Sequence, residues 1–382
     1  MRYDLAVIGL GGIGSAIVAQ AAARGASVVG VEQFGAAHAF GSSHGKSRMI
    51  RKAYFEEPAY VPLLRRAFDL WRELEVAANE EILSLTGLLT VGEAASEIIE
   101  GTQRAALEHD LPLKSLGRDE VSARHPTLQL RQGEVALLEA EAGVLKPERA
   151  IQAHLTVARA HHAEMHFEAV MKSWQATAGG FDILLGDGRK ISAGKLVLAL
   201  GPWFKEALAA LGLTVRVQRN VQAWFSPETN AYAAPGFPSF LLSRQDLPAA
   251  LYGFPDFGDG VKVAFHGAGE ETDPLHLDRE VHPGRDIVPL VRAMEKWMPG
   301  ATRTLNNASA CMYTLTPDEH FVVDRHPEYP DLILCGGFSG HGFKFAPVVG
   351  EIAADLALDG GTRHEIDFLS LARFRTRERS SA

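Results

Sequence analysis

Four glycines near the N-terminus have the spacing of a dinucleotide-binding loop. The run from Gly9 to Gly14 fits the pattern G-x-G-x-x-G, with Gly12 as an extra glycine inside it. Gly9 permits the tight turn, Gly11 lets the backbone approach a pyrophosphate, and Gly14 lets the following helix pack closely. Glu32 follows 23 residues after Gly9, where an acid can accept hydrogen bonds from a ribose. The pattern predicts an adenine dinucleotide but does not distinguish FAD from NAD.

Two lysines and one cysteine lie in apolar surroundings and are candidates for chemistry. Lys262 lies within the alternating stretch 261–265, on the face that it shares with Ala264. Lys344 lies between aromatic residues after an apolar strand. Most lysines are solvated surface charges, so each is either a surface residue or an electrostatic group directed into a pocket. On composition alone, Cys311 is more often a small buried hydrophobic residue than a reactive one.

Other candidate residues are less specific. Arg48 and Arg51 form a basic patch close in sequence to the glycine loop, and they fit either phosphate or surface contacts. No histidine has metal-ligand spacing with another histidine, a cysteine or a carboxylate, which argues against a zinc site; those near the motifs are His44, His266, His320 and His341. There is no G-x-S-x-G elbow and no Walker lysine, so hydrolase and NTPase functions lack support.

The predicted elements that must position these residues alternate between strands and helices. A strand at 5–8, a helix at 15–23 and a strand at 27–31 form a βαβ unit around the glycines. We predict a long helix at 60–83, a turn at 143–147 and helices at 148–161 and 348–359. Further strands are predicted at 88–91, 134–138, 181–185, 190–193, 195–200, 215–225, within 249–266 and at 332–335.

This order predicts an α/β protein of two domains, because glycine-rich loops return near residue 340 after long insertions. The nucleotide-binding domain would be discontinuous and use residues 1–85, 145–213 and 315–382. An antiparallel substrate domain would use residues 86–144 and 214–314.

Composition describes an ordinary soluble globular protein of 382 residues with a net charge of −9. The acidic balance argues against nucleic acid or an anionic membrane as the main partner, so an anionic substrate would need a local cationic cluster. Two cysteines exclude a disulfide scaffold, and no apolar run approaches a membrane span. The first strand begins too early for a signal peptide, and we expect a cytoplasmic protein.

The chain resembles the monomeric sarcosine oxidase and N-methyltryptophan oxidase family, within the D-amino-acid-oxidase-like flavoproteins, nearly end to end. The motifs that carry the resemblance are Gly41-Ser-Ser-His-Gly45 with Arg48-x-x-Arg51, Tyr252-Gly-Phe-Pro255, Gly260-Val-Lys-Val263, Cys311-Met-Tyr-Thr and Gly337-Phe-Ser-Gly-His-Gly-Phe-Lys344. Ser43 stands where the sarcosine enzymes carry a second histidine, and residues 222–247 depart further, in a segment expected to shape the pocket. The resemblance implies a Rossmann-like FAD-binding domain, of the glutathione-reductase and D-amino-acid-oxidase type, beside an antiparallel substrate domain.

The resemblance also implies roles for individual residues. FAD would be attached covalently, as a thioether between the flavin 8α carbon and Cys311. Arg51 and Lys344 would clamp the substrate carboxylate, and Lys262 would promote the reaction with oxygen. The remaining implied site residues are Tyr252 and His266 beside the substrate, Arg48 against the flavin ring, His44 near the cofactor, and the backbone of Gly340 and Gly342 near the flavin.

These residues predict an FAD-dependent oxidase of a small N-methyl amino acid, with sarcosine as the first choice and oxygen as acceptor. Glycine, formaldehyde and hydrogen peroxide would be the products, and we expect a monomer without nucleic-acid or membrane partners. The alternatives are an oxidase of N-methyltryptophan, pipecolate or proline type, a flavin dehydrogenase with another acceptor, and a catalytically idle nucleotide-binding protein.

Overall fold

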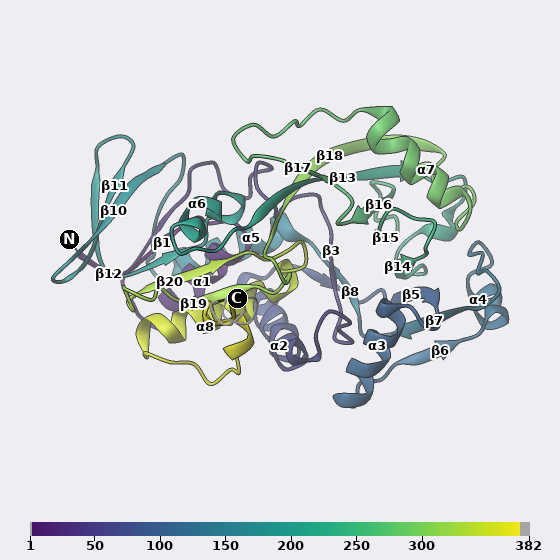
Figure 1. Cartoon of the computed structure of the whole chain (residues 1–382), viewed down its shortest axis with the longest axis horizontal. Coiled ribbons are helices and arrows are strands. Elements are labelled where there is room, and N and C mark those ends of the chain that lie inside the picture. Colours follow the sequence, from purple (N-terminus) through teal and green to yellow (C-terminus); the bar gives the residue numbers. More distant parts are fainter. Residues whose placement is uncertain (1, 375–382) are drawn as a thin grey trace, which may run out of the picture.

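The computed structural model describes residues 2–374, whose two large β-sheets lie at opposite ends of the molecule in Figure 1. One sheet has eight strands and carries the glycine loop, and the other has nine. A small sheet of three strands lies between them in this view. The mixed α/β class predicted from the sequence is confirmed.

The eight-stranded sheet is built around β1 (Arg2–Ile8), whose last four residues are buried. β1 pairs in parallel with β2 (Val28–Val31) on one side and with β12 (Lys190–Leu198) on the other. A strand buried on both faces reads as a continuous apolar run, as this one does. With α1 (Gly12–Ala23) as the crossover, the predicted βαβ unit is confirmed.

β12 replaces the two separate strands predicted at 190–193 and 195–200. Its first half pairs antiparallel with β11 (Gly180–Leu185), and its second half pairs in parallel with β20 (Leu332–Gly336). β12 therefore pairs with two different strands along the same edge, and the apolar pattern alone does not reveal this arrangement. The remaining strands of the sheet are β9 (Glu164–His166), β10 (Met171–Thr177) and β19 (Val322–Arg325).

Helices α1, α2 (Val61–Ala78), α5 (Pro147–Ala160) and α8 (Ala346–Leu358) pack together beside this sheet. At Gly350, a Cβ would lie 2.8 Å from the carbonyl carbon of Ala16, so glycine allows α1 and α8 to approach closely. The helix predicted at 60–83 ends earlier, because Asn79 adopts the left-handed conformation with φ of 50°.

The nine-stranded sheet is antiparallel apart from one pair, in which β14 (Ser239–Ser243) and β5 (Leu88–Glu93) run parallel. α7 (Val288–Glu295) and α3 (Glu97–Glu108) pack against it, and α4 (Arg118–Arg124) follows β6 (Lys114–Leu116). Its strands are β5 (Leu88–Glu93), β6 (Lys114–Leu116), β7 (Glu134–Glu139), β13 (Arg216–Ser226), β14 (Ser239–Ser243), β15 (Ala250–Phe254), β16 (Val261–His266), β17 (Glu270–Glu271) and β18 (Thr304–Leu315).

The small sheet consists of β3 (Arg48–Ile50), β8 (Gly143–Leu145) and β4 (Leu83–Ser84). The turn predicted at 143–147 is therefore wrong in its first part. A Cβ on Gly143 would lie 2.2 Å from the carbonyl oxygen of Ser84, so the glycine that suggested a turn instead permits close strand pairing. This pairing fixes Arg48 opposite Leu145.

Strands of the eight-stranded sheet come from the segments predicted for nucleotide binding, and those of the nine-stranded sheet from the two predicted insertions. The exact division into two domains stays a prediction. No helix within residues 2–374 is long and apolar enough to cross a bilayer.

Candidate active site

A cavity of about 460 Å³ opens at the N-terminus of α1 and is lined by Gly9, Gly11 and Gly12. Gly9 has a φ of 90°, and a Cβ there would meet the carbonyl oxygen of Ala199 at 2.3 Å. A Cβ on Gly14 would lie 1.7 Å from the carbonyl oxygen of Gly9. These two glycines are therefore required by the fold itself.

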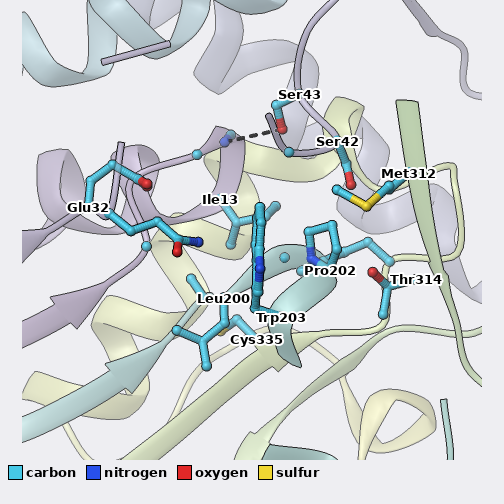
Figure 2. A pocket seen from close by; sticks show the side chains of 18 of the residues that line it. Ile13, Glu32, Ser42, Ser43, Leu200, Pro202, Trp203, Met312, Thr314 and Cys335 are labelled. Carbon is cyan, nitrogen blue, oxygen red and sulfur yellow. Dashed lines mark hydrogen bonds between the residues drawn. The ribbon is translucent and has the colours of Figure 1, made fainter. Parts of the chain in front are cut away.

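Gly11 differs, because nothing lies within 4 Å of the position its Cβ would take. A side chain there would project into the cavity and not into protein. The helix end behind it offers backbone N–H groups and a positive dipole. One of these groups, the Gly12 N–H, donates to Ser43 Oγ over 3.3 Å, which is the dashed line in Figure 2. The room beside Gly11 fits a pyrophosphate.

Glu32 lines the same cavity and is 4% exposed. Its carboxylate accepts hydrogen bonds from the N–H groups of Leu10 over 2.8 Å and Phe34 over 3.0 Å. His38 Nε2 lies 3.4 Å from the second oxygen. Glu32 thus binds the backbone of the glycine loop at Leu10 and the backbone of the loop after β2 at Phe34. The remaining lone pairs of its carboxylate are available for the predicted contact with a ribose.

Residues 41–48, here called the linking loop, run from the large cavity to β3. The carbonyl oxygen of Ser42 accepts from Arg48 Nη2 over 2.7 Å and from Cys311 Sγ over 3.5 Å. Glu148, in the first turn of α5, accepts from the N–H groups of Gly45 over 2.6 Å and Lys46. The loop has little regular structure, but its backbone is fixed by side chains from several elements.

Lys262 on β16 is 1% exposed and is held by this loop. Its Nζ donates to the carbonyl oxygens of Gly45 over 2.7 Å and Ser47 over 2.9 Å. Rings of Trp224 and Phe254 lie 5.2 and 5.3 Å from it. Burial lowers the pKa of Lys262 well below its usual value, and the nearby Arg48 acts in the same direction. An ammonium has three N–H donors, so one remains for another partner.

His44 and Lys262 do not line the large cavity, as far as residues 2–374 show. His44 is buried, and its Nε2 has no hydrogen-bond partner within the described residues. Burial lowers the pKa of His44 to about 3, with help from the charge of Arg48, so this side chain is neutral at pH 7.

A second cavity of about 80 Å³ brings together most of the other predicted site residues. It is lined by Arg51 and Lys344 from distant parts of the chain. The other predicted residues in its wall are Arg48, Tyr252, His266, Cys311 and Gly340. Arg48, Gly340 and Phe343 line both cavities, so the two spaces adjoin at these residues.

Arg51 is 4% exposed and already has an anionic partner, which the sequence did not reveal. Its Nη2 donates to both carboxylate oxygens of Glu56 over 2.7 Å, and its Nη1 donates to the carbonyl oxygen of Ala53 over 2.9 Å. Burial would raise the pKa of Glu56, but the positive charge of Arg51 lowers it to about 2. Glu56 is therefore ionised at neutral pH.

Glu139, at the end of β7, holds the turn that carries this pair. Its carboxylate accepts from the N–H groups of Lys52 over 2.6 Å and Ala53 over 3.1 Å. Glu139 is buried, and that burial raises its pKa although the two N–H groups oppose the shift. A strand of the nine-stranded sheet thus fixes the backbone next to Arg51.

Lys344 follows the strand β20 and is buried in the wall of the small cavity. Its Nζ donates to the carbonyl oxygen of His341 over 2.8 Å and to Tyr54 Oη over 3.3 Å. Burial lowers the pKa of Lys344 to about 7; Arg51 lowers it further and Glu56 opposes the shift. A bound carboxylate would favour the protonated form.

Tyr252 and His266 lie on β15 and β16 and share a neighbour, Tyr313, that was not named as a site residue. His266 Nδ1 lies 3.4 Å from Tyr313 Oη. Burial lowers the pKa of His266 to about 4 and raises that of Tyr313 well above its usual value, so both are neutral at pH 7. Tyr313 could have been found, because it lies two residues after Cys311 and alternation puts both on one strand face.

The loop after β20 closes the wall between the cavities. Gly340 has a φ of 80°, and a Cβ there would lie 2.4 Å from the ring of Tyr313. A Cβ on Gly342 would lie 2.5 Å from the side chain of Phe338. Both glycines line the large cavity. The backbone of this loop therefore borders the space in which the resemblance predicts the flavin ring.

The sequence matches the family described as DAO, FAD dependent oxidoreductase, over residues 4–356. The chain belongs to this family. It is 42% identical over 370 residues to the monomeric sarcosine oxidase of Streptomyces avermitilis, covering 95% of this chain and 96% of that one. It is 32% identical over 379 residues to the N-methyl-L-tryptophan oxidase of Yersinia pestis (strain Pestoides F), covering 98% and 100%.

Structural comparison agrees with the DAO fold. NikD, described as an unusual amino acid oxidase essential for nikkomycin biosynthesis, superposes with a TM-score of 0.84 at 23% identity, covering 97% of each chain. The predicted fold class is thereby confirmed. The room beside Gly11 and the position of Glu32 fit the FAD on which this family depends. Figure 2 shows Glu32 and Met312 toward opposite sides of the cavity that FAD would fill.

Proposed function

We propose that the protein is an FAD-dependent oxidase of a small N-methyl amino acid, with sarcosine as the leading substrate. The observation that carries this proposal is the small cavity, which combines two buried cations with a volume of about 80 Å³. At roughly 10–15 Å³ per water, it holds about five to eight water-sized groups. Sarcosine, with about six non-hydrogen atoms, suits this space, whereas N-methyltryptophan has about sixteen.

Arg51 and Lys344 would bind the substrate carboxylate. A guanidinium offers a planar fork of donors and an ammonium a point charge, and together they match a carboxylate well. Two of the three Lys344 donors are used within the protein, which leaves one for a ligand. Glu56 balances the charge of Arg51, so protonated Lys344 supplies the net local positive charge that an anionic substrate needs on a protein with a net charge of −9.

Three further side chains of the small cavity would orient the amine. Tyr252, His266 and Tyr313 line the small cavity, and the last two are neutral at pH 7. Neutral groups in this wall avoid repelling a protonated amine and can accept or donate hydrogen bonds. Leu241 and Gln222, from the segment expected to shape the pocket, also line it and limit its size.

FAD, when bound, would accept a hydride equivalent from the C–N unit of the substrate and pass two electrons to oxygen. Hydrolysis of the resulting imine would release glycine and formaldehyde, with one oxygen consumed and one hydrogen peroxide formed. Gly9, Gly11, Gly12, Gly14 and Glu32 would hold the nucleotide end. The flavin end would lie near Arg48, Gly340 and Gly342, with covalent attachment through Cys311 and with Lys262 as the cation that promotes oxygen reduction.

Peroxide production across a substrate panel tests this proposal. The purified holoenzyme should form peroxide under air with sarcosine at a higher kcat/KM than with N-methyltryptophan, pipecolate or proline. Preference for a bulky or cyclic substrate would instead assign another oxidase of the family. Flavin reduction by an amino acid without peroxide would indicate a dehydrogenase, and the absence of reduction by every amino acid would overturn the proposal.

A further inference from the structure

His341, which follows Gly340, carries its ring proton on a nitrogen that the structure identifies. Its Nε2 lies 2.9 Å from the carbonyl oxygen of Glu319, and a carbonyl oxygen can only accept. Burial lowers the pKa of His341 to about 3, so the neutral ring has a single N–H. That proton is therefore on Nε2, and Nδ1 is an acceptor.

Tyr54 is oriented by this tautomer. Its Oη lies 2.6 Å from His341 Nδ1, and because Nδ1 accepts, the tyrosine hydroxyl donates to it. Burial raises the pKa of Tyr54 well above its usual value, so it keeps that proton. The lone pairs of Oη then face Lys344, whose Nζ donates over 3.3 Å. The order of donation is fixed from Lys344 through Tyr54 to His341.

The ring of Tyr54 also lies against both cations of the proposed carboxylate site. Arg51 Cζ is 4.4 Å and Lys344 Nζ is 5.0 Å from its centroid. The electron-rich face of an aromatic ring attracts cations, so Tyr54 stabilises two like charges that repel each other. Tyr54 is fully buried and lines neither cavity within the described residues, so it does not touch a ligand there.

We propose that Tyr54 and His341 are positioning residues that hold the Lys344 ammonium toward the substrate carboxylate and stabilise its charge. The inference rests on the proposed function, in which Lys344 binds that carboxylate. His341 acts by accepting the hydrogen bond that the Tyr54 hydroxyl donates, so Tyr54 can only accept from Lys344. Without this arrangement the hydroxyl could turn its proton toward Lys344 and disfavour the ammonium.

The protonation state of Lys344 should set how the affinity for a carboxylate depends on pH. Besides Tyr54 and His341, the ionisable groups that bear on it are Arg51 and Glu56 beside it and His266 from β16. Glu56 stays ionised and His266 stays neutral near pH 7. Because the pKa of Lys344 is about 7, carboxylate affinity should be highest below pH 7 and fall up to tenfold per unit above it.

The inference is tested by measuring the affinity of the holoenzyme for acetate between pH 5.5 and 9, with flavin absorbance as the readout. Tyr54→Phe removes the acceptor, so the fall in affinity should begin about one pH unit lower and leave acetate about tenfold weaker at pH 8. Tyr60→Phe is the matched control. Tyr60 is a buried tyrosine 5.3 Å from the Tyr54 ring, and its Oη accepts from the Phe321 N–H. This control should keep the wild-type pH profile.

A second pair of variants keeps the test decisive if Tyr54→Phe does not fold. His341→Asn retains a side-chain acceptor for Tyr54 and should stay closer to the wild-type profile, whereas His341→Leu should shift it as Tyr54→Phe does. Unshifted profiles for both Tyr54→Phe and His341→Leu would overturn the inference. If Lys344→Met leaves acetate binding and its pH dependence unchanged, the proposed carboxylate site itself is wrong, which separates the two failures.

Discussion

Both carboxylate oxygens of Glu56 lie 2.7 Å from one nitrogen of Arg51, Nη2. Arg51 is thus paired inside the protein before a substrate carboxylate arrives. In the proposed function, a substrate carboxylate would have to share the guanidinium with Glu56 or displace it, and we expect this competition to lower its affinity. Glu56 would then limit which small anions this site binds.

Replacing Glu56 with Gln should strengthen carboxylate binding and weaken the fold. Removal of the competing anion frees charged hydrogen bonds worth about 1.5–3 kcal/mol each, so acetate should bind about tenfold more tightly. Loss of one partner leaves the buried Arg51 charge uncompensated and should lower the thermal midpoint. Glu57→Gln is the control, because Glu57 accepts only from the Ala59 N–H in the described part of the chain. Unchanged acetate affinity would show that Glu56 does not compete.

Cys311 should carry FAD covalently. Its Sγ lies 4.0 Å from Arg48 Nη2 in the wall of the small cavity. Acid precipitation should leave the yellow colour in the wild-type pellet, and Cys311→Ala should release it to the supernatant. Cys335→Ala is the control, since that buried thiol lines the large cavity and its pKa is raised by burial to about 12. Release of all flavin from the wild type would contradict covalent attachment.

Replacing Lys262 with Met should slow reoxidation by oxygen by about 10²–10³, which is the usual loss for one preorganised electrostatic partner. Anaerobic flavin reduction by substrate should change less, because Arg51 and Lys344 are assigned to substrate binding. Stopped-flow measurement of each half-reaction separates the two effects. Lys46→Met is the control, as its side chain is 53% exposed and pairs with Asp259. Equal reoxidation rates in wild type and Lys262→Met would make this lysine purely structural.

Two glycine substitutions should fail in different ways. Gly11→Val should fold, because its Cβ meets no protein atom within 4 Å, but it should bind FAD poorly because the new side chain projects into the cavity. Gly14→Val should not fold stably, because its Cβ would overlap the carbonyl oxygen of Gly9. Circular dichroism and bound flavin per chain measure the two outcomes. A Gly11→Val protein with full flavin content would refute the assignment of this space to the cofactor.

Local sequence patterns were sufficient to predict the nucleotide-binding half of the site. The glycines, β1 and Glu32 lie within one βαβ unit, where spacing fixes geometry. Alternation within β16 left Lys262 as either a surface residue or a group directed into a pocket, and it could not decide because the sheet buries both Lys262 and Val261, which lie on opposite faces. β18 was missed because Asn306 and Asn307 near its start favour turns over strands, and its long pairing with β13 is a tertiary effect.

The carboxylate site required contacts that no local pattern encodes. Glu56 pairs with Arg51 across a turn whose backbone is bound by Glu139. Glu139 belongs to the nine-stranded sheet, far from this turn in the sequence. Tyr54 and His341 are 287 residues apart in the chain. The resemblance supplied Arg51 and Lys344, but not the groups that set their charge and direction.

The linking loop 41–48 couples the large cavity mechanically to Lys262. Ser43 accepts from the Gly12 N–H at that cavity, and Gly45 and Ser47 supply the two backbone acceptors of Lys262. A displacement of this loop would change both places at once. We therefore expect a chain without its flavin to hold Lys262, the most buried lysine or arginine within residues 2–374, less firmly, so that cofactor loading would also complete the assembly of this region.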